Sequence, residues 1–334
     1  QLLNRKQLVG DTLMATALID ADILAYRSSS VGQLNVDWQD GNEGATLSEQ
    51  QALDSAEHIL KEWTKGARCK KSILCFSDKE NFRKKIYPKY KANRKGEKPE
   101  LLNTVIEYLK KKYEWYSVSY LEADDVMGIY ATSEYIRDAV IVSTDKDLNT
   151  IPAHLFNPDK DRAPHRNRTQ QADYFWMKQV LTGDSSDGYK GIEGIGPKKA
   201  EKILATVPQN INAMWQAVVQ AYIENKKTEQ DALTQARLSR ILRNTDYNAN
   251  TMEVSLWHPT TPMTLSITPN ITKGKSNPLN SSKRKNLDTA KATSSSTLSD
   301  GKKKEELKTS KNATGISINS SNTKKKSRKK NKAN

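Results

Sequence analysis

Five short stretches of the sequence bring acidic side chains together. They are residues 19–22, 76–78, 121–125, 143–147 and 183–187. On a helix, Glu122 and Asp125 are three residues apart and share a face, whereas Asp145 and Asp147, two apart at a strand end, point the same way. Carboxylates crowded at one site repel one another and protonate unless a cation neutralises them. The pattern therefore predicts a site for divalent cations.

The type of ligand narrows the choice of ion. Oxygen ligands without His or Cys favour Mg²⁺, with Mn²⁺ as an alternative, over zinc. The four histidines are scattered along the chain without ligand spacing. An acidic site that holds two such ions is a common means of phosphodiester hydrolysis. A single acidic motif is more often a solvated surface or a helix start, but five motifs in the same setting weaken that interpretation. Asp22 is interpreted as a helix cap or an outer-shell group.

Short apolar strands alternating with helices are expected to position these acids. The pattern predicts strands at 18–20, 72–76, around 118 and at 139–143, with helices at 48–63, 101–113 and 122–130. Such alternation is typical of a parallel sheet covered by helices. Asp20, Asp78 and Asp145 each follow a predicted strand, and ligands bind at the carboxyl ends of parallel strands. After Gln171 the pattern is helical, with predicted helices at 174–181, 198–205, 212–225 and 228–242.

A strongly basic segment follows Asp78 directly. Residues 79–98 contain nine Lys and Arg against two Glu, and Phe82, Tyr87 and Tyr90 are interspersed among them. Basic side chains neutralise phosphates, and aromatic rings stack on unpaired bases. The alternative is a solvated loop, but its position beside the predicted metal site favours contact with nucleic acid, with Arg83 among the basic residues.

A glycine-rich turn forms a second candidate contact. It contains Gly191, Gly194, Gly196, Pro197, Lys198 and Lys199. Glycine permits a close backbone approach, and Pro fits the first position of a helix. The amide groups of that helix start, together with the two lysines, form an anion site suited to a DNA backbone. The turn is neither a dinucleotide-binding fingerprint nor a Walker loop, because no strand precedes it and the Walker spacing is absent.

Charge is distributed unevenly along the 334 residues. Residues 271–334 hold 18 Lys and Arg against 4 Asp and Glu, which accounts for nearly all of the formal net charge of +15. This Ser/Thr/Asn/Lys-rich tail is predicted to be disordered from about 265 to 334 and to attract phosphates. Cys69 and Cys75 lack metal or redox spacing and are expected to be reduced. No secretory signal or membrane span is expected, so the predicted location is the cytoplasm or host nucleoid, or the nucleus in a eukaryotic host.

Together these segments resemble the flap endonuclease and 5′-3′ exonuclease family. The resemblance runs in order from Leu18 to Ala205, through Asp20, 76–78, 90–94, 121–125, 143–147, 183–187 and 191–199. Residues 236–243 and 256–257 look most like the gene 6-type exonucleases of short-tailed phages, which extends the resemblance to about Pro259. Two features depart from the family pattern. Ala21 stands where Gly is common, and the basic tail has no counterpart.

The resemblance implies a fold and a domain plan. It implies an α/β fold whose mainly parallel central sheet is flanked by helices (PIN or 5′-nuclease-like), with a helical arch and a helix-hairpin-helix type C-terminal subdomain. The expected metal-binding nuclease domain spans 1–170 with the arch at about 79–100. A helical DNA-binding subdomain spans 171–260 and contains the glycine hairpin 191–199.

The resemblance also implies roles for single residues. The first metal is expected among Asp20, Asp78, Glu122, Asp124 and, as a further candidate, Asp125, and the second near Asp145, Asp147, Asp184 and Asp187. Lys91 and Arg94 are expected to act in catalysis by offsetting charge on the scissile phosphate. Tyr90 is expected to stack on a terminal base, and the glycine turn to hold the duplex.

Three functions follow from these expectations. The first is a Mg²⁺-dependent 5′-3′ exonuclease on duplex DNA, with removal of RNA primers from RNA–DNA hybrids as an extension. The second is a structure-specific 5′-flap endonuclease of the same fold. The third is a non-catalytic DNA-binding protein, which the intact set of acids argues against. A nucleotide phosphotransferase is disfavoured, because no phosphate-cradling loop follows a strand.

Overall fold

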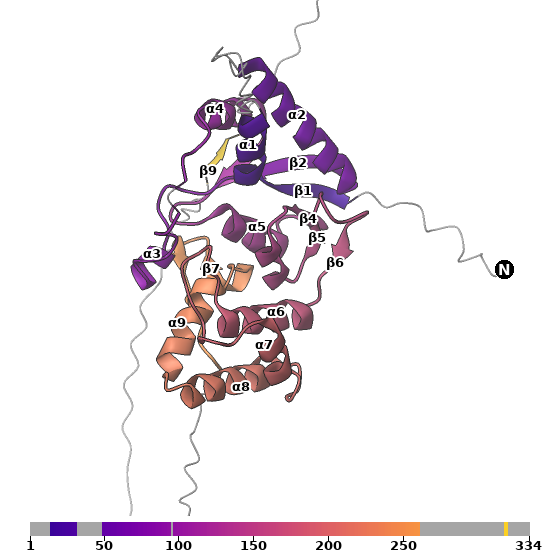
Figure 1. Cartoon of the computed structure of the whole chain (residues 1–334). Coiled ribbons are helices and arrows are strands. Elements are labelled where there is room, and N and C mark those ends of the chain that lie inside the picture. Colours follow the sequence, from indigo (N-terminus) through magenta and orange to yellow (C-terminus); the bar gives the residue numbers. More distant parts are fainter. Residues whose placement is uncertain (1–13, 32–48, 95, 261–316, 320–334) are drawn as a thin grey trace, which may run out of the picture. The chain divides into compact units, whose positions relative to one another are not determined.

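The computed structural model of the chain describes residues 14–31, 49–94, 96–260 and 317–319 (Figure 1). All of these belong to one compact unit, Gln1–Thr261 with Thr314–Asn334, and the second unit, Pro262–Ala313, lies outside the described residues. The predicted disorder of the basic tail therefore concerns residues that are not described, except for 317–319, which form a short strand. Among the described residues, no helix is both long enough and apolar enough to span a bilayer.

A seven-stranded sheet holds the N-terminal part together, with strand order β6-β5-β4-β1-β2-β3-β9. β1 (Met14–Asp20) lies at its centre and pairs in parallel with both β2 (Cys69–Cys75) and β4 (Ala139–Val142). Parallel pairing continues outward to β3 (Trp115–Ser117) and β5 (His154–Phe156). The two edges are antiparallel, formed by β6 (His165–Arg166) and β9 (Ser317–Asn319). The prediction of a mainly parallel central sheet is confirmed.

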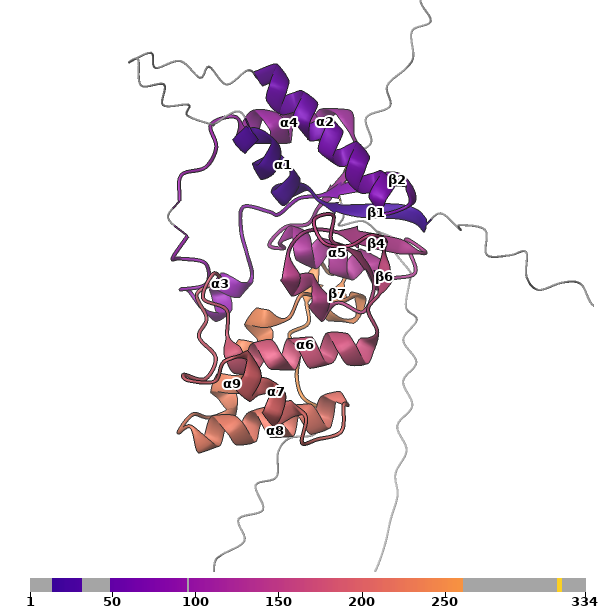
Figure 2. The same ribbon diagram turned by 45° about the vertical axis from the view of Figure 1, so that its right-hand side comes forward.

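Alternating side chains give the sheet two apolar faces. Ala17 and Ile19 of β1 point to one face, where α1 (Ala21–Ser30), α2 (Glu49–Gly66) and α4 (Leu102–Lys112) pack. Leu18 points to the other face, which α5 (Ala123–Ala131) covers. Figures 1 and 2 show these helices on opposite sides of the strands. Because both faces are covered, every residue of β4 is buried, as is usual for the centre of a parallel sheet.

Helices dominate the chain after the sheet. α6 (Thr169–Thr182) packs against α7 (Pro197–Leu204), α8 (Ile211–Glu224) and α9 (Glu229–Ser239). Trp257, beyond the last helix, lies edge-on to Trp176 of α6 and Trp215 of α8, with ring centroids 4.9 and 5.0 Å apart. The remaining short elements are α3 (Arg83–Ile86), η2 (Lys146–Thr150), η3 (Asn244–Asp246), β7 (Tyr247–Asn248) and β8 (Glu253–Val254).

Two expectations about helices differ from the structure. The last predicted helix, 228–242, ends at Ser239 because Arg240 adopts an extended conformation and the amide of Leu242 donates to Asp125 instead of continuing the helix. The expected helical arch at 79–100 contains only the four-residue α3, followed by turns up to residue 93. The basic residues of this segment are therefore carried mostly by turns and extended chain among its described residues.

Candidate active site

Three of the predicted acids stand at the starts of helices. Asp20 is the last residue of β1 and the N-cap of α1, where its side chain accepts from the amide of Ile23 at 3.1 Å. Glu122 is the N-cap of α5, and Asp145 is the N-cap of η2, where it accepts from the amide of Asp147 at 2.8 Å. These cap bonds fix the carboxylates of Asp20 and Asp145 at the sheet edge, where the parallel strands end.

One small cavity is lined by five of the predicted acids. These are Glu122, Asp124, Asp145, Asp147 and Asp187. Lys91, Tyr90 and Arg83 line the same cavity, so cationic and acidic groups face a shared space. The structure therefore brings together acids that are as distant in the chain as Glu122 and Asp187. Two more acids are linked to this group. Asp20 is linked to Asp145 through Ser143, and Asp184 is linked to Asp147 through Lys146.

Ser143 connects two of the acids. Its hydroxyl donates to Oδ2 of Asp20 at 2.7 Å and accepts from the backbone amide of Asp145 at 3.0 Å. No role was predicted for this residue, although its place at the end of β4, level with Asp20, could have indicated one. Ser143 thus holds the ends of two neighbouring strands, and their carboxylates, in a fixed relation.

Three acids lack a cationic partner sufficient to keep them ionised. Burial, followed by the negative charge of Asp22, raises the pKa of Asp20 to about 7. Burial and the neighbouring Asp20 and Asp145 raise the pKa of Asp124 well above its usual value. Burial and Asp145 raise the pKa of Asp147 to about 7. Mutual repulsion of this kind is what a bound cation would relieve.

The same acids fit a hard divalent cation by their chemistry. Buried Oδ1 of Asp147 has no hydrogen-bond partner, and buried oxygens left unpaired are uncommon. Within the described ranges, however, no three His, Cys, Asp or Glu side chains already surround one point as ligands would. The donor set is therefore suited to Mg²⁺ or Mn²⁺, whereas the side chains stand farther apart than ligands around a single ion.

Two cations of the basic segment are paired with acids that line the cavity. Nζ of Lys91 bonds to Oε1 of Glu122, and Arg94 bonds to Oδ1 of Asp187 at 2.6 Å. Burial acts to raise the pKa of Glu122, but Arg83 and Lys91 outweigh it and lower the pKa to about 2. Glu122 therefore remains ionised. Both predicted catalytic cations are thus paired with acids of the cluster.

Tyr90 and Arg83 lie inside the protein and not on its surface. The ring of Tyr90 is 3% exposed, and its hydroxyl lies 3.0 Å from both Glu122 and Asp187. Arg83, 2% exposed, donates to both oxygens of Asp125 at 2.7 and 2.8 Å. In this conformation Tyr90 has no free face for a base, and Arg83 cannot reach a DNA backbone. Both expectations are corrected by this burial.

Asp125 is likewise fully occupied by the protein. Besides Arg83, its carboxylate accepts from the amide of Leu242 at 3.0 Å. Arg83 itself also donates to the carbonyls of Leu238 and Arg240, at 2.9 and 2.6 Å. This buried ion pair joins α5 to the end of α9. Asp125 therefore has a structural role, and we remove it from the candidate metal ligands.

A closed loop carries the two acids of the helical part. Residues 183–191 close on themselves through paired backbone bonds between Asp184 and Tyr189, of 2.8 and 3.1 Å. Gly183 and Gly191 cross so closely that a Cβ on Gly191 would lie 2.4 Å from the amide nitrogen of Gly183. Gly191 is therefore needed for this crossing and is buried, which argues against the contact with DNA expected for it.

Lys146 joins that loop to the sheet edge. Its Nζ lies 2.9 Å from Asp184 and 3.6 Å from Asp147. Burial acts to raise the pKa of Asp184, but hydrogen bonds from Ser186 and the charge of Lys146 leave it below its usual value. Lys146 was part of a recognised motif yet was not predicted to belong to the site. Its position between two acids was not foreseeable from the spacing alone.

Asp78 and Asp22 stand at the margin of the cluster. Oδ2 of Asp78 accepts from the amide of Tyr120 at 2.8 Å, and Oδ2 of Asp22 accepts from the amide of Ser77 at 3.1 Å. Neither lines the cavity described above. The interpretation of Asp22 as an outer group agrees with this position. The structure brings Asp78 to the correct sheet edge, but it does not place it in contact with the other predicted ligands.

The glycine-rich turn leads into α7 as expected. Gly196 is the N-cap, and Pro197 is the first helical residue, which confirms the predicted helix start. Gly194 adopts φ 75° with nothing near its open side, and Lys198 and Lys199 are exposed. The turn therefore presents free backbone and two cations to solvent, an arrangement suited to a phosphate.

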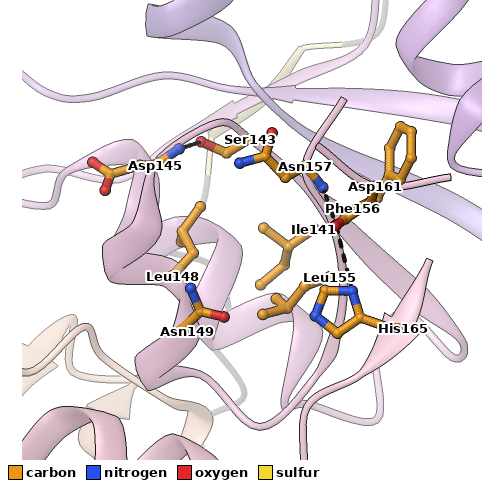
Figure 3. A pocket seen from close by; sticks show the side chains of 10 residues that line it. All are labelled: Ile141, Ser143, Asp145, Leu148, Asn149, Leu155, Phe156, Asn157, Asp161 and His165. Atoms are coloured by element: carbon orange, nitrogen blue, oxygen red, sulfur yellow. Dashed lines mark hydrogen bonds and ion pairs between the residues drawn. The ribbon is translucent and has the colours of Figure 1, made fainter. Parts of the chain in front are cut away.

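A second cavity lies behind Asp145 and differs in character. Figure 3 shows Asp145 turned away from it, while the apolar side chains of Ile141, Leu148 and Leu155 point toward its centre. Asp161, on its rim, accepts from the amide of Asn157 at 2.7 Å. Its volume of about 40 Å³ has room for water only. The acids that could serve in catalysis therefore face the other cavity.

Comparison with known proteins agrees with this architecture. A family model described as 5'-3' exonuclease, N-terminal resolvase-like domain, matches residues 15–165. The exonuclease of Escherichia phage T7 is 29% identical over 282 residues, covering 72% of this chain and 93% of that protein. The flap endonuclease Xni of Shewanella sp. (strain ANA-3) is 30% identical over 181 residues, covering 50% of this chain and 69% of that protein.

A solved structure shares the fold. The bacteriophage T5 flap endonuclease, in complex with DNA and metal ions, superposes with a TM-score of 0.53 at 18% identity. The match covers 69% of this chain and 90% of that one. At this level of identity the likeness concerns the fold alone.

Proposed function

Because this chain belongs to the family of 5′-3′ exonucleases and flap endonucleases, we propose that it hydrolyses phosphodiester bonds of duplex DNA from a 5′ end. The observation that carries this proposal is the cavity lined by five acids and by Lys91. A non-catalytic DNA-binding protein would have no need to bury so many mutually repelling carboxylates, because their repulsion costs stability.

Divalent cations are the proposed cofactors, with Mg²⁺ first, Mn²⁺ second, and two ions in all. Asp20, Asp124 and Asp145 would hold one ion, and Asp147, Asp184 and Asp187 the other, with Asp78 and Glu122 as additional donors. Bound ions of this kind supply a water of lowered pKa and neutralise charge on phosphate oxygens. The raised pKa values of Asp20, Asp124 and Asp147 support this division, since these groups most need a cation.

The protein's own cations have a separate proposed task. Lys91 and Arg94 are held at the cavity by Glu122 and Asp187. When a DNA phosphate enters, the two side chains would turn from these acids to the phosphate and offset the charge that develops there. Lys198 and Lys199 would contact the backbone of the duplex away from the cut, without reading its sequence.

The substrate range is also a proposal. The T7 relative is called an exonuclease and the Shewanella relative a flap endonuclease. We give priority to stepwise 5′-3′ digestion because the T7 relative is matched over nearly its whole length. Flap cleavage is the second candidate, and RNA–DNA hybrids are an additional substrate. The proposed location is the cytoplasm or the host nucleoid, where the duplex substrate would be found.

Digestion of end-labelled DNA tests the proposal directly. Blunt and 5′-flapped duplexes are incubated with and without Mg²⁺, and the products are sized. We expect short 5′ products only with Mg²⁺. Asp145→Ala should abolish cleavage and leave DNA binding nearly unchanged, whereas the control Asp161→Asn, on the far side of Asp145, should retain activity. Full turnover by Asp145→Ala would refute the catalytic claim.

A further inference from the structure

Tyr120 combines an exposed ring with a strained backbone beside the acid cluster. It lies two residues before Glu122, its φ is 66°, and its side chain is 45% exposed. A bulky residue rarely adopts a positive φ, and such strain persists only where the surroundings enforce it and often marks a functional position. Burial does not explain the strain here, because nearly half of the residue faces solvent.

Hydrogen bonds hold the backbone of Tyr120 in this conformation. Its amide donates to Oδ2 of Asp78 at 2.8 Å, and its carbonyl accepts from the amide of Phe82 at 3.0 Å. The next carbonyl, of Leu121, accepts from the amide of Asp78 at 2.9 Å. These bonds fix the backbone of Tyr120 between Asp78, a candidate metal ligand, and Phe82 at the start of the basic segment.

A cation accompanies the ring. Nζ of Lys85, an exposed residue of α3, lies 4.2 Å from the centroid of Tyr120. An exposed aromatic ring with an adjacent lysine is the combination that takes a base by stacking and its phosphate by charge. Tyr90, in the basic segment, cannot fill this role because its ring is buried. Tyr120 therefore has both the chemistry and the exposure that Tyr90 lacks.

We propose that Tyr120 is a stacking platform for one unpaired base at the 5′ side of the phosphate to be cut, with Lys85 contacting the adjacent phosphate. This inference rests on the proposed nuclease function and adds to it a positioning residue, one that would hold the unpaired 5′ nucleotide of a flapped duplex. Every base has a stacking face, so the preference concerns the unpaired state and not the sequence.

Binding of fluorescent duplexes by the full chain tests the proposal. One duplex carries an unpaired 5′ 2-aminopurine and the other is blunt, and both are titrated in Ca²⁺ so that they are not consumed. We expect the wild type to quench the unpaired base. Tyr120→Gly and Tyr120→Asn should relieve the quenching and weaken binding of the overhang about tenfold, with less than about twofold change for the blunt duplex.

The choice of variants separates loss of stacking from loss of folding. Gly and Asn both tolerate a positive φ, so neither variant should melt at a lower temperature than the wild type. Tyr120→Phe retains the ring and should bind both duplexes as the wild type does. The matched control Tyr135→Ala removes a ring that is 80% exposed in the loop after α5 and should change neither affinity.

The outcomes separate this inference from the proposed function. Unchanged overhang binding by Tyr120→Gly and Tyr120→Asn, or an equal loss for both duplexes, would overturn the stacking role while Mg²⁺-dependent cleavage by the wild type still supported a nuclease. Absence of cleavage by the wild type on every substrate would instead refute the proposed function itself.

Discussion

Six of the acids predicted for the site fall into two groups with opposite surroundings. Asp20, Asp124 and Asp147 are crowded by other carboxylates, and their pKa values are raised. Glu122, Asp125 and Asp184 are instead paired with basic side chains of the protein. The contrast is sharpest between Asp124 and Asp125, which are neighbours in α5 yet belong to different groups. We refer to the two sets as the uncompensated and the compensated acids.

The difference indicates what each set is for. The uncompensated acids carry charge that the cations of the protein do not fully balance, even though Lys146 lies 3.6 Å from Asp147. Their repulsion costs stability, and a bound metal ion would relieve it. The compensated acids are already balanced, and Asp125 in particular serves to join α5 to the end of α9. Substitutions in the two sets should therefore affect different properties, and four predictions test this division.

The largest effect is expected in the uncompensated set. Asp147→Asn removes a repelling charge from a site that needs it for a cation, so cleavage should fall about a thousandfold or more while the melting temperature stays equal or rises. Single-turnover cleavage and thermal melting measure the two quantities. Retained cleavage combined with a lower melting temperature would show that Asp147 belongs to the compensated acids instead.

The next effect concerns the compensated set. Arg83→Met leaves the carboxylate of Asp125 buried without a partner, so the free energy of unfolding should fall by about 3–5 kcal/mol in urea titrations. The double variant Arg83→Met/Asp125→Leu removes both charges and should recover most of that loss, because two apolar groups replace a buried pair. A double variant no more stable than the single one would argue against the pairing as the cause.

The third prediction uses the pH dependence of stability to distinguish the uncompensated from the compensated acids. For Asp20 and Asp147 the folded-state pKa of about 7 lies above the ordinary value of 3.8, so the native state keeps protons that the unfolded chain has already lost. Stability of the metal-free protein should therefore fall as pH rises from 5 to 7.5, by about 5 kcal/mol for the two groups together, and then level off. Glu122, with a pKa lowered to about 2, acts in the opposite sense but only below this window.

Chemical denaturation in EDTA across that pH range measures the slope. Saturating Mg²⁺ should flatten it, because the bound ion keeps the acids ionised in the native state as well. A metal-free stability that rises from pH 5 to 7.5 would contradict the presence of uncompensated acids.

The smallest predicted effect concerns Lys146, which lies between the two sets. Its ammonium competes with a cation for Asp147 and Asp184, so Lys146→Met should lower the half-saturating Mg²⁺ concentration about threefold to fivefold in thermal-shift titrations. Lys65→Met, which removes only a surface pair with Glu62 at 3.9 Å, is the matched control and should leave the titration unchanged. A higher Mg²⁺ requirement would mean that Lys146 supports the ion.

Much of the fold was predictable because it depends on local patterns. Apolar runs followed by acids identified β1 and β4, and the rule for parallel sheets placed Asp20 and Asp145 at one edge. Pro197 after Gly196 identified the start of α7. These signals lie within a few residues of the features that they predict, so a single sequence is sufficient to read them.

The rest depended on partners distant in the chain. Asp125 is paired with Arg83, 42 residues away, and with the amide of Leu242, 117 residues away. No spacing rule indicates such contacts, so the charged and aromatic residues Arg83 and Tyr90 were assigned to the surface. Tyr120 was missed for the opposite reason, because its importance arises from its exposure and its backbone conformation, neither of which the sequence pattern indicates.

The edge-to-face group of Trp176, Trp215 and Trp257 gives the helical part an internal optical probe. The indole of Trp257, from the segment beyond the last helix, lies within 5.0 Å of those of Trp176 in α6 and Trp215 in α8. Departure of Trp257 would expose two otherwise buried indoles and shift ultraviolet emission to longer wavelength. Intrinsic fluorescence can therefore report, without any label, whether the final segment stays seated while DNA is held.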